Sequence, residues 1–402
     1  MIAAEPEGRP TMAPPRVLHV ITGLAHGGAE MLLVRMLDEL GDERAGHSVL
    51  SLRPRWPLAE QIEEMGVPVH ALGMSGVPTP ADIFRLGRFL RRTPVDVIQT
   101  WMLHSNVLVG LTARIVGRSP VVWGVHVTDV SRSIQGTKAV LLQRLEALCS
   151  WFVPSCIVAC SVSAHRVMDR LRYRRRRIVT ILNGFDVAQF KPDPTARSEV
   201  RGELGISPTT VVVGHVARFH PMKDHPTLLA AAGKVLDQVP DLRFVLVGDG
   251  VTADNPELRA LAAPLGDRVM MLGRRTDMPR LLNAFDLAVQ SSSIGEALPL
   301  VIGEAMATGL PVVSTRGGDA EDLIADAGTT TPVGDPTALA EAMIGLIAID
   351  PEQRAELGGR GRARISDRYA MRRMVEGYRK TWAEVSSADD PASHPPVEAS
   401  AS

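Results

Sequence analysis

Short runs rich in Val and Ile alternate with longer stretches of helical period from Arg16 onward, and this alternation constrains the fold more than any other feature. Strand-like runs include RVLHVITGL, HSVLSL, VPVHALGM and DVIQTW, whereas AEMLLVRMLDEL and PADIFRLGRFLRR have helical period. Strands that alternate with helices form parallel sheets covered by helices on both faces. The pattern continues through VVWGVH, CIVACS and RIVTILNG, and it predicts an N-terminal α/β domain of about 170 residues.

The alternation stops once and then starts again. The segment FDVAQFKPDPTARSEVRGELGISPTT reads as a linker, and the strand-like runs VVVGHVA, LRFVLVGDG, VMMLG, LAVQSS and PVVSTR follow it. We therefore expect two doubly wound, Rossmann-like α/β domains that face each other across a ligand-binding cleft. The expected division is a disordered leader (1–15), an N-terminal domain (16–186), a C-terminal domain (187–370), a helix that packs back on the N-terminal domain (371–386) and a disordered tail (387–402).

Charge and cysteine content narrow the function. The chain has 44 Lys and Arg against 45 Asp and Glu, so no overall basic field attracts nucleic acid, and any anion site must be local. Its three cysteines make no disulfide framework and indicate a reducing compartment. Because no signal peptide or bilayer-spanning run is found, we expect a cytoplasmic protein, with a peripheral contact at the inner face of the membrane left open.

A glycine-rich turn follows the first strand. Gly27 and Gly28 precede a helix that we expect to open at Ala29, and glycines there let backbone N–H groups approach an anion at the helix N-terminus. The turn lacks the G-x-G-x-x-G pattern, and no acidic residue follows the second strand, which makes a nicotinamide dehydrogenase a remote alternative. A tight turn that needs glycine only for its geometry is the structural alternative.

Two cations and a histidine follow strands of the two domains. Arg218 and Lys223 come just after the first strand of the second domain, where a guanidinium and an ammonium can neutralise a diphosphate leaving group without a metal. His126 ends the strand VVWGVH and would face the same cleft. The alternatives are a solvated surface pair for the two cations and a hydrogen-bonded structural residue for the histidine.

The most specific motif pairs two acids seven residues apart. Glu296 lies in a loop and Glu304 on the following helix, whose first turn we expect to contain Pro299. The free N–H groups of Leu300 and Val301 are then placed for phosphate oxygens, and the two carboxylates can accept hydrogen bonds from sugar hydroxyls. A capping residue and a solvated glutamate are the structural alternative.

These landmarks in this order resemble the retaining glycosyltransferases of the GT-B fold, and among them glycosyltransferase family four, also called glycosyl transferases group one. The strings that carry the resemblance are GGAE, WGVH, NGFD, GHVARFHPMKDHPTLL, LVGDG and EALPLVIGEAMATGLPVV. They extend over about residues 16–386. The E-x7-E segment is the most specific of them.

The resemblance implies roles for the acids and the cations. Glu304 would bind the ribose hydroxyls of a nucleotide, Glu296 would contact hydroxyls of the donor sugar, and Arg218 and Lys223 would bind the diphosphate. Ala297 follows the first acid where the family usually has glycine. No Asp-x-Asp metal site occurs in the expected context, so the resemblance implies a leaving group stabilised by the cations and no metal.

The resemblance also implies roles outside the acidic motif. His126 would meet the donor sugar through its side chain or backbone. Gly27 and Gly28 would lie near the donor phosphate and the acceptor. Arg274 and Arg275 would receive the nucleobase, largely through backbone groups.

The implied activity is hexosyl transfer from a nucleotide diphosphate sugar, either a UDP- or a GDP-sugar, to a hydroxyl acceptor with retention at the anomeric carbon. The acceptor would be a glycan or a lipid-linked molecule in glycan, polysaccharide or glycolipid biosynthesis, and no other cofactor is implied. A GT-B nucleotide-sugar epimerase and a non-catalytic sugar-nucleotide-binding protein remain as alternatives.

A basic cluster and two cysteines stand outside these motifs. RLRYRRRR, from Arg170 to Arg177, is either a solvated helix end or a contact with an anionic membrane. Cys156 and Cys160 have no further metal ligands nearby in the sequence, and we expect them to be small buried hydrophobes.

Overall fold

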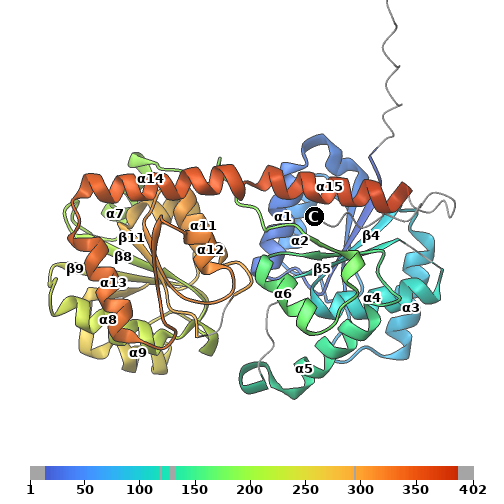
Figure 1. Cartoon of the computed structure of the whole chain (residues 1–402), viewed down its shortest axis with the longest axis horizontal. Helices are drawn as coiled ribbons and strands as arrows, with labels where there is room; N and C mark the ends of the chain where they lie inside the picture. Colours follow the sequence, from blue (N-terminus) through green and yellow to red (C-terminus); the bar gives the residue numbers. More distant parts are fainter. Residues whose placement is uncertain (1–13, 118–119, 127–131, 294–295, 388–402) are drawn as a thin grey trace, which may run out of the picture.

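Two α/β bodies lie side by side in the computed structural model, which describes residues 14–117, 120–126, 132–293 and 296–387 (Figure 1). The leader and tail that we expect to be disordered fall almost wholly outside these residues. Within the described part of the chain, no helix is both long and apolar enough to cross a membrane.

The N-terminal body is built on a seven-stranded parallel sheet with the order β3-β2-β1-β4-β5-β6-β7. All five residues of each of β1, β4 and β5 are buried, as expected for strands covered on both faces. The strands are β1 (Val17–Ile21), β2 (His47–Ser51), β3 (Val69–Ala71), β4 (Val97–Trp101), β5 (Val121–Val125), β6 (Cys156–Ala159) and β7 (Ile178–Thr180).

Helices cover both faces of this sheet and enclose a separate apolar cluster on each. One face carries α1 (Gly28–Glu39) and α2 (Leu58–Glu64). The other face carries α3 (Pro80–Arg92), α4 (Met102–Ile115), α5 (Arg132–Cys149) and α6 (Val162–Arg170). The three cysteines are free and buried, as expected, and burial raises the pKa of Cys156 and of Cys160 to about 12.

The C-terminal body repeats this plan on a six-stranded parallel sheet with the order β10-β9-β8-β11-β12-β13. Its strands are β8 (Val211–Val216), β9 (Leu242–Val247), β10 (Val269–Met271), β11 (Leu287–Gln290), β12 (Val312–Thr315) and β13 (Gly328–Thr331). Its helices are α7 (Pro194–Glu203), α8 (His225–Leu236), α9 (Pro256–Ala262), α10 (Met278–Leu281), α11 (Leu300–Ala307), α12 (Ala320–Ile324), α13 (Pro336–Ala348) and α14 (Pro351–Arg368). The predicted class, two Rossmann-like α/β domains, is therefore confirmed.

The chain crosses between the two bodies twice, and the two crossings are hydrogen-bonded to each other. Phe185 N donates to Tyr369 O at 2.7 Å, and Met371 N donates to Phe185 O at 2.9 Å. After the second crossing, α15 (Met371–Ser387) continues the line of α14 onto the N-terminal body (Figure 1). There Tyr378 and Trp382 of α15 are buried in the same apolar cluster as α1.

Candidate active site

The N-terminus of α1 lies against the N-terminus of α11 across the two bodies. Gly27 is the N-cap of α1, and the helix begins at Gly28, one residue before the predicted start at Ala29. A Cβ on Gly28 would lie 3.2 Å from Cδ1 of Leu300. The glycine therefore lets the two helix ends approach closely, which gives it a role beyond the geometry of a turn.

Helix α11 begins one residue later than expected. Pro299 was predicted to lie in its first turn, but its ψ of 98° makes it the N-cap, and Leu300 is the first helical residue. The N–H groups of Leu300 and Val301 belong to the helix end that has no intrahelical acceptors and carries the positive end of the dipole. This end, facing α1, is suited to an anion.

Lys223 and Glu296 form a direct ion pair beside this helix end. Lys223 Nζ lies 2.5 Å from Glu296 Oε1, and both side chains are about one-fifth exposed, so the lysine is not a solvated surface cation. Gln290 Nε2 at 2.7 Å and Ser292 Oγ at 2.6 Å donate to the same oxygen. Among the described residues, these donors all meet Oε1 and leave Oε2 available to a ligand.

Arg218 occupies the loop after β8 and faces α1. Its side chain is exposed, and its charge acts on Glu30 in the first turn of α1. Burial raises the pKa of the Glu30 carboxyl, and Arg218 partly offsets that rise. The sequence pattern did not single out Glu30, because an acid in the first turn of a helix is common for its favourable interaction with the dipole.

Glu304 makes a contact across the two bodies. Arg35 Nη1 of α1 lies 2.6 Å from Glu304 Oε1, with side chains 15% and 10% exposed, so the acid is not a solvated glutamate. The guanidinium also lies over the Phe190 ring, 4.9 Å from its centroid. Arg35 was missed by sequence analysis, because one arginine on an amphipathic helix is typical of a solvent-facing surface.

His126 lies at the end of β5 with its ring stacked on Trp101, the two centroids 5.0 Å apart. Neither ring nitrogen has a hydrogen-bond partner among the described residues. Burial lowers the pKa of His126 to about 4, so the imidazole is neutral at pH 7. Among the residues that the structure describes, the ring therefore has unused donor and acceptor capacity.

Arg274 and Arg275 follow β10 on a loop next to the glycine turn after β9. Gly248 N donates to Gly273 O at 2.9 Å, which joins the two loops. The Arg274 side chain is exposed, whereas the Arg275 guanidinium donates to both carboxylate oxygens of Asp277 at 2.7 and 2.6 Å. Arg275 can therefore serve a ligand here mainly through its backbone.

The loop that carries Glu296 is also held against the N-terminal body. Asp319 accepts hydrogen bonds from Val162 N and Ser163 N at the start of α6, both at 2.7 Å. Ser163 Oγ donates to Ala297 O at 3.1 Å. Asp319 is a further residue that sequence analysis missed, since its partners lie more than 150 positions away along the chain.

Two facing parallel-sheet domains, recrossed by a C-terminal helix and opposed at their helix N-termini, define the GT-B class of fold. Sequence profiles of two glycosyltransferase families divide the chain in the same way. The profile of Glycosyltransferase Family 4 matches residues 26–189, and that of Glycosyl transferases group 1 matches residues 210–348. The chain therefore carries a Glycosyltransferase Family 4 domain followed by a Glycosyl transferases group 1 domain.

Curated relatives agree with these domain assignments, and solved structures share the fold. A glycosyltransferase named EpsF of Bacillus subtilis is 28% identical over 74% of this chain and 78% of its own. A GDP-mannose-dependent monoacylated alpha-(1-6)-phosphatidylinositol monomannoside mannosyltransferase of Corynebacterium glutamicum is 28% identical over 75% of this chain and 79% of its own. The crystal structure of Anabaena HepE in complex with UDP-glucose shares the fold, with a TM-score of 0.80 and 24% identity over 92% of this chain and all of that one.

Proposed function

We propose that the protein is a retaining glycosyltransferase that moves a hexosyl unit from a nucleotide diphosphate sugar to a hydroxyl acceptor. The observation that carries the proposal is the Lys223–Glu296 ion pair beside the α11 N-terminus, at the point where α1 of the opposite domain approaches. A cation and free helix amides suit a diphosphate, and a carboxylate with an available oxygen suits a sugar hydroxyl.

The diphosphate would lie between the α11 amides and the two cations. During transfer, the bond from the anomeric carbon to the phosphate oxygen breaks, and negative charge grows on that oxygen. Lys223, Arg218 and the helix dipole would stabilise this charge and so lower the barrier without a metal ion. The new bond from the acceptor oxygen forms on the same face, and the acceptor proton goes to the departing phosphate.

The remaining site residues would position the donor. We assign Glu304 to the ribose hydroxyls, which requires the carboxylate to share or exchange its contact with Arg35. We assign His126 to the donor sugar, where its ring nitrogens, which have no partner within the described part of the chain, supply hydrogen-bonding capacity. The backbone beside Arg274 and Arg275 is assigned to the nucleobase.

The donor is expected to be a UDP- or GDP-sugar, since the mannosyltransferase relative is named for GDP-mannose and the HepE structure holds UDP-glucose. A glycan or a lipid-linked hydroxyl is the proposed acceptor, in line with the phosphatidylinositol mannoside in that relative's name. Three free cysteines support a reducing, cytoplasmic site of action.

A transfer assay tests the proposal. The purified protein is incubated with UDP- and GDP-hexoses and a panel of glycan and lipid-linked acceptors, and products are detected by mass spectrometry. We expect a mass gain of one hexose on an acceptor, with release of the nucleoside diphosphate. The anomeric configuration of the product, measured by NMR, is expected to match that of the donor.

The alternatives give different outcomes in the same assay. An epimerase would convert the nucleotide sugar in the absence of any acceptor. A non-catalytic sensor would bind a nucleotide sugar without turnover across the whole panel. The inverted configuration at the anomeric carbon would overturn the retaining assignment.

A further inference from the structure

Helix α5 exposes a row of leucines to the outside of the N-terminal domain. Leu141, Leu145 and Leu148 are 68%, 42% and 63% exposed, and their spacing places them on one stripe of the helix. Trp151 and Phe152, just after the helix, are 54% and 44% exposed. These five side chains form what we call the α5 apolar face, and contiguous apolar patches of this kind mark interaction sites.

The opposite side of α5 is fixed to the domain core, so the helix cannot turn to bury its leucines. Glu146 is 2% exposed and accepts hydrogen bonds from Asn106 Nδ2 and Tyr173 OH, each at 2.6 Å. Asn106 in turn bonds to Gly124 O of β5 at 3.1 Å. The exposure of the α5 apolar face is therefore a fixed property of this domain.

Arginines border the α5 apolar face. From Arg132 to Arg177 the sequence holds ten Lys and Arg but only two Asp and Glu, in a chain whose overall charge is −1. Trp151 Nε1 donates to Arg172 O at 3.1 Å, and Arg174 Nη1 donates to Trp151 O at 2.8 Å, which joins the basic segment to the apolar face. Arg175 and Arg176 are exposed beside them.

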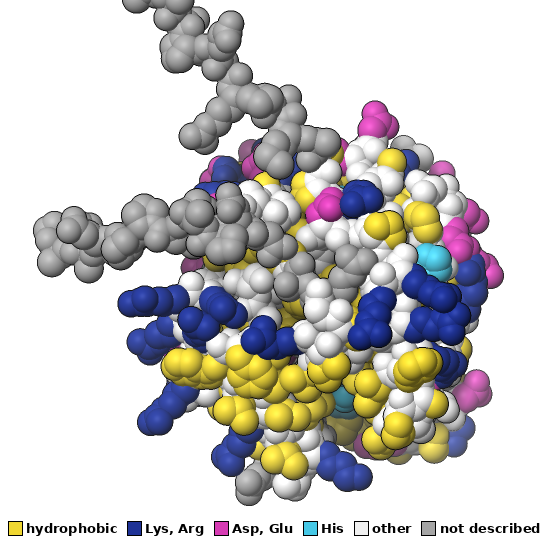
Figure 2. All heavy atoms as spheres, turned by 90° about the vertical axis from the view of Figure 1, so that its right-hand side faces the viewer, with side chains coloured by type: hydrophobic (Ala, Val, Ile, Leu, Met, Phe, Trp, Pro, Cys, Tyr) yellow, Lys and Arg dark blue, Asp and Glu magenta, His cyan; other side chains and the backbone are white. Residues whose placement is uncertain are grey.

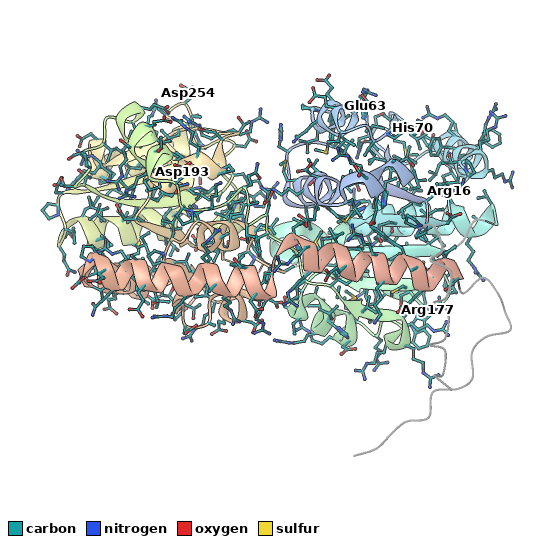
Figure 3. The ribbon with its side chains drawn as sticks, turned by 90° about the horizontal axis from the view of Figure 1, so that it is seen from above. Arg16, Glu63, His70, Arg177, Asp193 and Asp254 are labelled. Atoms are coloured by element: carbon teal, nitrogen blue, oxygen red, sulfur yellow. The ribbon has the colours of Figure 1, made fainter. Side chains whose placement is uncertain are left out.

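Apolar and basic side chains also lie next to each other on the surface at the end of this domain. Figure 2 shows the end of the N-terminal domain, where apolar side chains gather in a band with Lys and Arg above and below it. Arg177, labelled in Figure 3, belongs to the same basic segment and donates to Pro154 O, in the loop that follows Phe152. We call the exposed basic residues Arg172, Arg175 and Arg176 the arginine rim.

We propose that the α5 apolar face and the arginine rim dock the N-terminal domain on an anionic membrane surface. Leucines and aromatic rings would enter the boundary between headgroups and acyl chains, while the arginines bind headgroup phosphates. A second copy of the chain fits this surface less well. In a two-fold dimer, the same patch meets itself and brings the arginine rims of both copies together, where like charges repel.

Membrane docking would hold the interdomain cleft near the bilayer, where a lipid-linked acceptor presents its hydroxyl. This consequence rests on the proposed function. Docking itself does not, because it can be measured without a nucleotide sugar or an acceptor.

Vesicle co-sedimentation tests the docking surface. The full chain is expected to pellet with vesicles containing phosphatidylglycerol, less with pure phosphatidylcholine, and less at high salt. The double variant Arg175→Gln/Arg176→Gln should bind about 30-fold more weakly, since each arginine near an anionic surface contributes about a fivefold gain. The double variant Leu141→Ser/Leu148→Ser should bind about tenfold more weakly, because two exposed side chains no longer enter the bilayer.

Control variants carry changes of the same kind in the C-terminal domain. Arg259→Gln/Arg360→Gln removes two exposed charges, and Val333→Ser removes an exposed apolar side chain; both are expected to bind like the unaltered chain. Wild-type protein that stays in the supernatant with anionic vesicles would overturn the proposal. Pelleting of the leucine and arginine variants equal to that of the unaltered chain would also overturn it. A dimer that is seen in analytical ultracentrifugation and that the leucine variant dissociates would overturn it in favour of a second copy of the chain.

A second readout does not depend on these variants. In a Trp56→Phe background, Trp151 is the remaining exposed tryptophan among the described residues, since Trp101, Trp123 and Trp382 are fully buried. Vesicles with brominated acyl chains should quench its fluorescence. Fluorescence unchanged while the protein pellets would place the α5 apolar face outside the bilayer and contradict the proposal.

Discussion

At the residue scale, the proposed site depends on two acids, and neighbouring side chains hold the carboxylate of each. Glu296 accepts three hydrogen bonds on one oxygen, whereas Glu304 is bound by Arg35 from the other domain. Sequence analysis selected both acids, because their spacing around a helix start is distinctive. It could not select Arg35, Gln290 or Ser292, since nothing in their local sequence separates them from ordinary surface or strand residues.

The role assigned to Glu304 predicts a specific loss of affinity. Glu304→Ala should bind the preferred nucleoside diphosphate about tenfold more weakly or worse in calorimetry, because hydrogen bonds to a charged acceptor are worth ~1.5–3 kcal/mol. The 2′-deoxy analogue should bind the unaltered chain more weakly than the ribose form, yet bind the variant as well as the ribose form does. Glu341→Ala, on α13, serves as the control. Equal discrimination against the deoxy analogue by both proteins would exclude a contact between Glu304 and the ribose.

At the element scale, the sheets and most of the helices follow from the sequence, because buried parallel strands read as continuous Val- and Ile-rich runs. The helix starts were less accurate: α1 begins at Gly28 and α11 at Leu300, each one residue from its predicted position. A local pattern cannot fix these ends, because the close approach of the two helices decides them. The sequence likewise cannot tell which glycines inside helices are needed for close packing, because the neighbouring side chains come from distant parts of the chain.

Two helical glycines should respond in opposite ways to alanine. A Cβ on Gly303 of α11 would overlap the Phe185 ring, so Gly303→Ala should destabilise the protein by about 2 kcal/mol and weaken nucleotide binding by displacing α11. Gly345 of α13 has open space around it, so Gly345→Ala should stabilise the protein by about 1 kcal/mol. Urea unfolding measures both. A Gly303→Ala variant with an unchanged free energy of unfolding would show that α11 is free to shift.

The contact of α15 with the N-terminal domain should make stability depend on pH. Trp382 packs on the His19–His47 pair, and burial lowers the pKa of His47 to about 4, with Arg379 adding to the shift. Below pH 6.5 the unfolded chain therefore binds a proton that the folded chain does not, and stability is lost progressively down to about pH 4. Between pH 7 and 5, the free energy of unfolding of the unaltered chain should fall by about 2 kcal/mol more than that of His47→Gln. An equal fall in the free energy of unfolding of both proteins would show that other groups cause the pH dependence.

At the scale of the whole molecule, two domains were expected from the restart of the α/β alternation, but their mutual contacts were not. Arg35 with Glu304, and Asp319 with the start of α6, join residues far apart in the sequence that no periodicity connects. No periodicity connects the two crossings of the chain either, although Phe185 joins them by hydrogen bonds. These contacts hold the α1 and α11 ends opposite each other, which is the arrangement on which the proposed chemistry depends.

The most direct test of the account is the turnover of Lys223→Ala with a donor and acceptor that the unaltered chain uses. Removing the cation from the leaving diphosphate is expected to lower kcat about 100-fold or more, with unchanged urea unfolding. Lys234→Ala, which removes an exposed lysine from α8, should keep full turnover. Turnover by Lys223→Ala equal to that of the unaltered chain would contradict the assignment of Lys223 to the leaving group, and with it the proposed mechanism.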